Sequence, residues 1–94
     1  MVRRSRLEIY FDILNVIENG VIKPTQIMYA TNLSWANLQN IFNILIKSGF
    51  ITEEMKKKTK RYQITEKGRK ALSYYEKSLN GLVDVEQVFI RNSP

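Results

Sequence analysis

The sequence contains no cysteine and no histidine, and these two absences exclude whole classes of protein. Without cysteine, the chain can form no disulfide, no thiolate metal site and no cysteine nucleophile. Without histidine, it has no imidazole base, no serine–histidine triad and no zinc finger. Glycine is also scarce, and its four residues lie far apart, so no glycine-rich loop can hold phosphates. We therefore expect a protein that is not an enzyme and that binds no cofactor and no metal.

Long apolar runs are missing as well. The longest, such as Ile44–Ile46, are far shorter than the roughly 18–20 residues that cross a bilayer. Residues 1–6 are basic, but a helical pattern follows them rather than the apolar core and cleavage site of a secretory signal. We expect a soluble, cytoplasmic protein with no membrane partner.

Positive charge is present in excess, with 15 lysine and arginine residues against 9 acidic ones and a net charge of +6. A length of 94 residues with 44% apolar residues is typical of one small folded domain. The surplus is local: residues 51–70 hold eight cations and three acids, whereas residues 71–94 hold two cations and three acids. A small basic domain of this kind favours binding to a polyanion.

Two helices are predicted in the first third of the chain. Ser5 followed by Glu8 forms a capping box, so we expect a helix over residues 5–19. The segment of residues 21–23 is short and favours β-structure, and we expect it to form one or two pairs of a β-ladder. A proline then suits the first turn of a second helix, expected over residues 24–31.

A third helix is predicted over residues 34–48, with Ser34 as its N-cap. Its apolar residues recur at the i, i+3, i+4, i+7 spacing of one helix face. That stripe comprises Leu38, Ile41, Phe42 and Leu45.

A β-hairpin and a last helix complete the order. Strands are expected over 50–55 and 61–64, around a lysine-rich tip that lacks the Asn-Gly signal of a tight two-residue turn. Thr65 then caps a final helix. Two helices joined by a short turn and followed by a hairpin make a winged helix-turn-helix. The predicted class is mainly α with a small β-hairpin (α+β).

The helix over residues 34–48 is the element that a winged helix-turn-helix places in the major groove. Side-chain amides suit adenine, which Asn or Gln can bind through N6 and N7. The alternative is an ordinary solvated helix face. The candidate DNA-binding residues here are Ser34, Trp35, Asn37, Gln39, Asn40, Asn43 and Lys47.

The hairpin tip carries five cations in six residues, which would place positive potential against the DNA backbone or the minor groove. The alternative is a solvated charged turn that prevents strand-edge aggregation. We expect Glu53 and Glu54 not to neutralise this run. The candidate residues are Lys56, Lys57, Lys58, Lys60 and Arg61.

Three further assignments stay open. Arg3 and Arg4 are candidate DNA contacts on an N-terminal arm that also holds Arg6, or parts of a frayed, solubilising end. Trp35 either packs in the core or lies against DNA. Tyr29 is expected in the core, with a phosphate contact through its hydroxyl as the alternative.

The C-terminal region continues an apolar pattern beyond the expected winged domain (residues 1–68). Steps of three and four residues indicate a heptad seam, which a second copy of the chain could cover in a two-fold homodimer. We therefore assign residues 69–94 to a helical dimerisation segment. Asn80-Gly81 could instead end the helix, leaving a disordered tail. The candidate interface residues are Leu72, Tyr75, Leu79, Leu82, Val85 and Phe89.

Three stretches resemble a known family: residues 3–9, Lys23–Trp35 and Tyr62–Gly68. They are similar to the small archaeal winged helix-turn-helix DNA-binding proteins, which include a Sulfolobus chromatin-type protein that dimerises through an antiparallel coiled coil. The resemblance covers roughly residues 3–72. It implies a winged helix, double-stranded DNA as ligand and a dimer formed by the last helix, although the tail here is shorter and less regular.

The predicted function is therefore double-stranded DNA binding as a homodimer, sequence-specific or sequence-tolerant. The protein would act as an archaeal transcriptional regulator or a chromatin-like protein. The alternative is a winged-helix module that binds other proteins of the transcription machinery.

Overall fold

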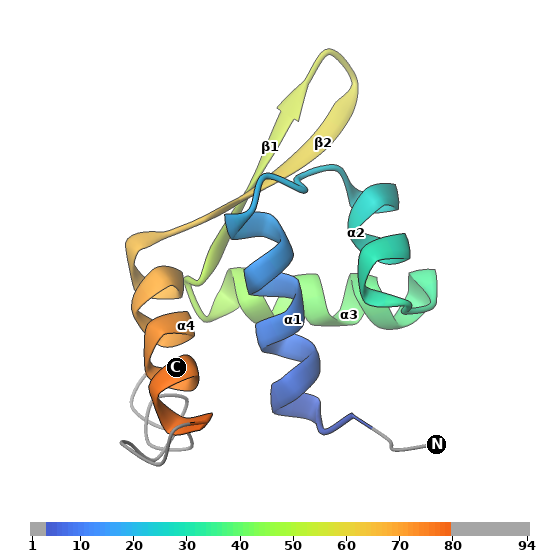
Figure 1. The fold of residues 1–94 in the computed structure, drawn as a ribbon. Coiled ribbons are helices and arrows are strands. Elements are labelled where there is room, and N and C mark those ends of the chain that lie inside the picture. The colour runs from blue at the N-terminus through green and yellow to red at the C-terminus, as the bar shows by residue number, and fades with distance from the viewer. Residues whose placement is uncertain (1–3, 80–94) are drawn as a thin grey trace.

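The computed structural model describes residues 4–79 and has the predicted architecture of four helices and one antiparallel hairpin (Figure 1). The predicted fold class, mainly α with a small hairpin, is confirmed. In chain order the elements are α1 (Arg6–Glu18), α2 (Pro24–Thr31), α3 (Trp35–Lys47), β1 (Ile51–Lys56), β2 (Thr59–Ile64) and α4 (Glu66–Leu79).

The helix starts follow from local capping. The Ser5 hydroxyl accepts a hydrogen bond from the Glu8 backbone N–H at 3.1 Å, and the Glu8 carboxylate accepts one from the Ser5 N–H at 3.4 Å. Both bonds of the capping box are therefore present. At the start of α3, the Ser34 hydroxyl accepts from the Asn37 N–H at 3.2 Å. Asn32 ends α2 in the left-handed region, at φ 56°, and turns the chain sharply toward α3.

Helix α1 lies at the centre of the molecule, with α2 and α4 on either side and α3 behind it (Figure 1). The expected apolar stripe of α3 points inward, although Ile41 is only half buried. The least exposed side chains come from all four helices and both strands, and they form one continuous core. They are Phe11, Ile13, Leu14, Ile27, Leu38, Phe42, Leu45, Phe50, Ile51, Tyr62 and Ala71.

The expected short strand over residues 21–23 does not form. The sheet has two strands, β1 and β2, in antiparallel register. Residue Ile22 still contributes one backbone hydrogen bond, since its carbonyl accepts from the Tyr62 N–H at 2.9 Å. This bond holds the segment between α1 and α2 against the base of the hairpin.

Helix α4 packs directly on the segment that leaves α3. The Thr65 hydroxyl accepts from the Gly68 N–H at 3.0 Å, as expected of an N-cap. A Cβ at Gly68 would lie only 2.2 Å from the carbonyl oxygen of Phe50, so this contact requires glycine. Farther along, the ring of Tyr75 stacks on that of Phe11, with centroids 4.1 Å apart. The described part of α4 therefore shares the core of the winged domain.

Candidate nucleic-acid interface

The hairpin is joined to α3 by a buried aromatic pair. The rings of Phe42 and Tyr62 stack with their centroids 4.0 Å apart. The Tyr62 hydroxyl donates a hydrogen bond to the Glu53 carboxylate at 3.0 Å. Burial, followed by this hydrogen bond and the negative charge of Glu53, raises the pKa of Tyr62 above its ordinary value. These contacts fix the orientation of the hairpin relative to α3.

The hairpin tip is a two-residue turn made of two lysines. Lys56 pairs with Thr59, so Lys57 and Lys58 form the turn, at φ 49° and 65°. Two consecutive residues of positive φ are typical of a type I′ turn, which normally selects asparagine and glycine. The tight turn therefore forms without the Asn-Gly signal, and lysine occupies a backbone conformation that is unfavourable for it.

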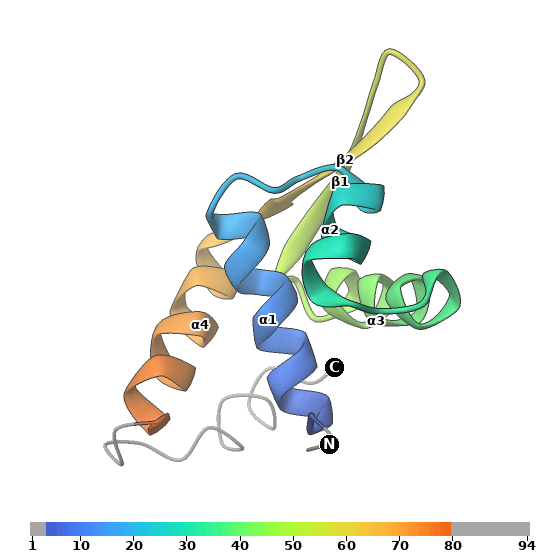
Figure 2. The ribbon, with the colours of Figure 1, turned by 45° about the vertical axis from the view of Figure 1, so that its right-hand side comes forward.

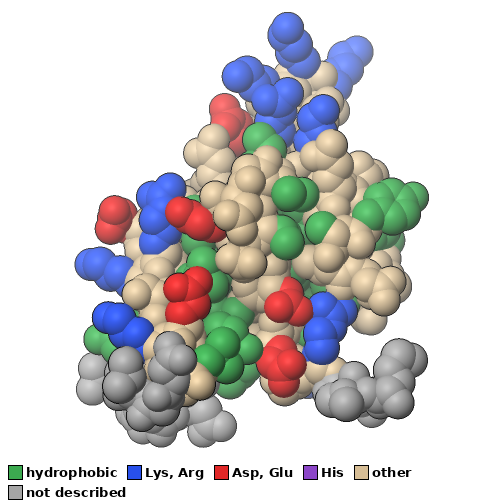
Figure 3. Space-filling model, in the orientation of Figure 1, with side chains coloured by type: hydrophobic (Ala, Val, Ile, Leu, Met, Phe, Trp, Pro, Cys, Tyr) green, Lys and Arg blue, Asp and Glu red, His purple; other side chains and the backbone are tan. Residues whose placement is uncertain are grey.

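The charges of the hairpin are only partly neutralised. Lys60 Nζ lies 3.8 Å from Glu53 Oε1, so the expectation that Glu53 leaves the cationic run unpaired is wrong for Lys60. Within the described residues, no carboxylate forms an ion pair with Lys56, Lys57 or Lys58. Figure 3 shows Lys and Arg side chains crowded at the outer hairpin, whereas most Asp and Glu side chains on that face lie over α1 and α4.

Arg61 differs from the lysines of the hairpin. It is half buried in the middle of β2, opposite Glu54 in the strand register. Its Nε atom is buried and has no hydrogen-bond partner. Part of its guanidinium group is therefore occupied by packing, and only the rest could reach a ligand.

The outer face of α3 is polar. Asn37, Asn40, Asn43 and Lys47 are exposed, and Gln39 is half buried. In Figure 2, α3 and the hairpin tip lie on one side of the molecule and α4 lies on the other. The structure therefore brings the predicted helix residues and the predicted hairpin residues to the same side.

The four amides of α3 form one polar arc around the helix. Asn37 and Asn40 line an open groove that α3 forms with the first half of α1. Asn43 lies only about 60° from Asn40, and Gln39 lies farther along the same arc, since successive residues turn by about 100°. The packing of α1 therefore places two of the four amides beside the groove.

Two aromatic residues are exposed where α2 meets α3. Tyr29 is 80% exposed, so its expected place in the core is wrong. It lies two residues after buried Ile27, which is about 200° around the helix, and this spacing could have revealed its outward position. Trp35, at the first position of α3, is 48% exposed, which leaves one side of its ring accessible to a ligand.

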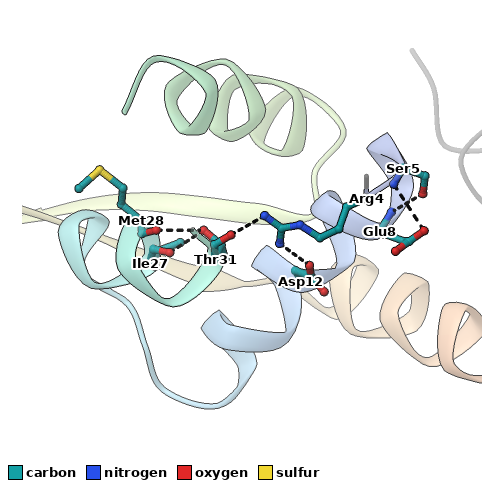
Figure 4. Close-up of polar contacts among 7 residues, drawn as sticks. All are labelled: Arg4, Ser5, Glu8, Asp12, Ile27, Met28 and Thr31. Carbon is teal, nitrogen blue, oxygen red and sulfur yellow. Dashed lines mark hydrogen bonds and ion pairs between the residues drawn. The ribbon is translucent and has the colours of Figure 1, made fainter. Parts of the chain in front are cut away.

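Arg4 is held within the chain rather than extended as an arm (Figure 4). Its Nη1 atom forms an ion pair with Asp12 Oδ2 at 2.7 Å, and its Nη2 atom donates to the Thr31 carbonyl at 2.6 Å. The guanidinium thus joins α1 to the last residue of α2, where the helix carbonyls are otherwise unpaired. A DNA contact by Arg4 would have to break these bonds. Arg3 lies outside the described residues.

The candidate dimer residues fall into three groups. Leu72 is 7% exposed and packs in the chain's own core, and Tyr75 is half buried against Phe11. Leu79, at the end of α4, is 69% exposed. The remaining three, Leu82, Val85 and Phe89, lie outside the described residues, as does the Asn80-Gly81 pair. Two of the six expected seam residues, Leu72 and Tyr75, thus pack within their own chain.

Within residues 4–79, the acidic side chains form no group of three or more that could hold a metal ion. The same part of the chain has no helix that is long and apolar enough to cross a membrane.

Comparisons with known proteins agree with this architecture. A family model described as winged helix-turn-helix matches residues 3–82. The Methanocaldococcus jannaschii protein MJ0287 is 41% identical over 71 residues, which are 76% of this chain and 69% of that protein.

Solved structures show the same likeness. Sso10a-2, a DNA-binding protein from Sulfolobus solfataricus, superposes with a TM-score of 0.68 at 25% identity, covering 97% of this chain and 98% of that one. The transcriptional regulator SlyA superposes with a TM-score of 0.66 at 22% identity, covering 92% and 61%. The chain belongs to the winged helix-turn-helix family, and its relatives include archaeal proteins.

Proposed function

We propose that this protein binds double-stranded DNA and acts as an archaeal transcriptional regulator or a chromatin-like protein. The observation that carries the proposal is the shared orientation of two features, the lysine turn and the polar outer face of α3, which the Phe42–Tyr62 stack holds together. In this proposal α3 enters the major groove and the hairpin lies on the backbone or in the minor groove. The DNA-binding function of Sso10a-2 supports it.

The base contacts would come from the outer side of α3. Gln39 and Asn43 are one turn apart and can offer amide groups to adjacent base pairs. Asn37 and Asn40 would contact DNA from the side that faces the groove with α1. Ser34, Trp35 and Tyr29 lie at the start of this surface and would contact the backbone.

We further propose that the protein acts as a homodimer. Two linked DNA-binding domains would bind two half-sites, and occupancy of one raises the effective concentration at the other. Half-sites about 34 Å apart would correspond to one turn of DNA.

The experiment that tests DNA binding is a gel-shift titration of a short duplex from about 50 to 200 mM salt. Neutralising three tip residues, Lys56→Gln, Lys57→Gln and Lys58→Gln, should reduce the salt slope by about three, since each phosphate contact contributes roughly 0.9. The matched control neutralises three cations of α4, Lys67, Lys70 and Lys77, and therefore has the same net charge.

Two outcomes would contradict the proposal. Equal losses in the tip variant and the α4 control would mean that net charge alone attracts DNA. An absence of duplex binding at about 50 mM salt would favour the alternative, a module that binds other proteins of the transcription machinery.

A further inference from the structure

A groove of 680 Å³ opens between α1 and α3, on the side of α3 that carries Asn37 and Asn40. Its size is within the range of sites that bind ligands or peptide side chains. Half of its lining is aliphatic and comes from α1, the turn and α3. These residues are Ile9, Leu33, Ile41 and Ile44.

The rim of this groove carries polar groups without partners. Arg6 projects from the start of α1, opposite Asn37 and Asn40 on α3. Within residues 4–79, the Arg6 guanidinium and the two side-chain amides make no hydrogen bond or ion pair. Ile44 is 40% exposed although it is a large apolar residue. The groove therefore combines an apolar floor with one free positive charge.

The packing of α4 against α1 explains why the apolar residue at the end of α4 is exposed. The two helices run in opposite directions (Figure 1), and Tyr75 stacks on Phe11. One turn farther along, Leu79 reaches the level of Leu7, one residue from the start of α1 at Arg6. At this end of α4, Leu79 is 69% exposed and has little of α1 to pack against.

The sequence after Leu79 has the composition of a groove-binding segment. Leu82, Val85 and Phe89 are spaced i, i+3 and i+7, which is the anchor pattern of a helix that binds in a groove. Asp84 and Glu86 lie between these anchors and complement the free charge of Arg6. Fifteen residues follow Leu79, which is ample for such a contact.

We propose that residues 82–90 of one copy bind in the α1–α3 groove of a second copy, and that the exchange is reciprocal. The anchors cover the aliphatic floor, and Asp84 or Glu86 pairs with the partner's Arg6. This inference rests on the proposed homodimer and replaces a seam through Leu72 and Tyr75, which are used inside the chain. Because Asn37 and Asn40 line the groove, the bound segment would engage these two amides in place of DNA and would leave Gln39 and Asn43 for the base contacts.

The absence of cysteine makes a direct test possible, because single cysteines can be introduced without background. Two full-length variants, Ile44→Cys and Val85→Cys, are mixed and treated with a short bismaleimide. The expected product is a covalent heterodimer. The matched control replaces Ile44→Cys with Thr25→Cys, an exposed position at the start of α2 and outside the groove, and should give little product.

The double variant Ile44→Cys/Val85→Cys distinguishes exchange between two copies from binding of the segment in the groove of its own chain. Linked dimers would support the exchange, whereas a linked species of monomer mass would overturn it in favour of an intrachain contact. Sedimentation of the unmodified protein tests the homodimer separately from the groove assignment. A dimer without Ile44–Val85 linkage overturns the groove assignment alone, and a monomer overturns both this inference and the homodimer, while gel shifts report DNA binding independently.

Charge reversal gives a second, non-covalent test. Ile44→Glu should weaken the dimer at least about tenfold, since it would bury a charge in the groove floor. Arg6→Glu should weaken it by a few fold, as expected of a rim charge pair. Restoration of the dimer when Arg6→Glu is combined with Glu86→Arg would support the pairing. A dimer that is unaffected by Ile44→Glu would contradict the proposal, provided that thermal melting shows a folded variant.

Discussion

The ring of Tyr62 in β2 stacks on the ring of Phe42 in α3, with centroids 4.0 Å apart and ring planes 20° from parallel. Tyr62 also hydrogen-bonds to Glu53 on the neighbouring strand, so one side chain connects both strands to α3. The hairpin therefore has a fixed position relative to the helix, although its outer half extends away from the core.

Tyr62→Phe should change the dependence of stability on alkaline pH. The raised pKa keeps Tyr62 protonated in the folded state, whereas an unfolded tyrosine ionises near pH 10. The stability contributed by the protonated hydroxyl is therefore complete below about pH 10 and is lost as pH rises above it, by up to about 1.4 kcal/mol per pH unit. Urea unfolding between pH 8 and 11 should show this extra slope in the wild type only. Parallel pH profiles for the two proteins would contradict the assignment.

Gly68→Ala should destabilise the fold severely. The added methyl group would lie 2.2 Å from the carbonyl oxygen of Phe50, and a backbone atom cannot move away as a side chain can. We expect a loss of about 3 kcal/mol in the free energy of unfolding, at the upper end of the usual cost of overpacking. Ser73→Ala, at an exposed position in the middle of α4, is the control and should be nearly neutral or stabilising. If Gly68→Ala left the free energy of unfolding unchanged, α4 would have to pack less closely on the Phe50 carbonyl than the structure shows.

Replacing Lys57-Lys58 with Asn-Gly should separate stability from binding. Asn and Gly adopt positive φ with less strain, so the hairpin should gain about 1–2 kcal/mol. DNA affinity should fall nevertheless, because two phosphate contacts are lost. The Lys57→Gln/Lys58→Gln variant keeps the strain and removes the charges, so its affinity should fall equally without any gain in melting temperature. Unchanged affinity in both variants would remove the turn from the proposed interface.

Arg4 provides a test of structural against DNA-binding roles. Arg4→Gln removes the ion pair with Asp12 and weakens the bond to the Thr31 carbonyl, which should cost about 1 kcal/mol of stability. Its gel-shift salt slope should match that of the wild type, because the guanidinium is already occupied. A slope reduced by about one would instead show that Arg4 contacts phosphate. Asp12→Asn is the matched variant: it should lose similar stability without removing a cation.

Elements whose signals are local were predictable from the sequence. The capping box at Ser5 and the N-cap at Ser34 depend on groups within three residues, so their residue types indicate the helix starts. The same holds for the inward stripe of α3, since one helix period determines which side chains share a face. The basic hairpin was predictable because its charges are consecutive.

Assignments that depend on contacts between distant segments were not predictable. Tyr29 looked like a core residue because it is aromatic, but it is 80% exposed, and within residues 4–79 no element covers its side of α2. Arg4 looked like a free arm because its partners, Asp12 and Thr31, are brought together only when α1 packs against α2. Leu72 resembled an interface residue, yet the winged domain needs it for its own core.

The sequence by itself determined the composition of the proposed interface: a helix rich in amides, a lysine hairpin, and no cysteine or histidine. These properties follow from residue identity and short-range periodicity. Only the tertiary structure decided which side chains are free to bind. Burial and ion pairing depend on where α1 and α4 pack, and that packing occupied Arg4 and Leu72, exposed Tyr29, and opened a groove beside α3.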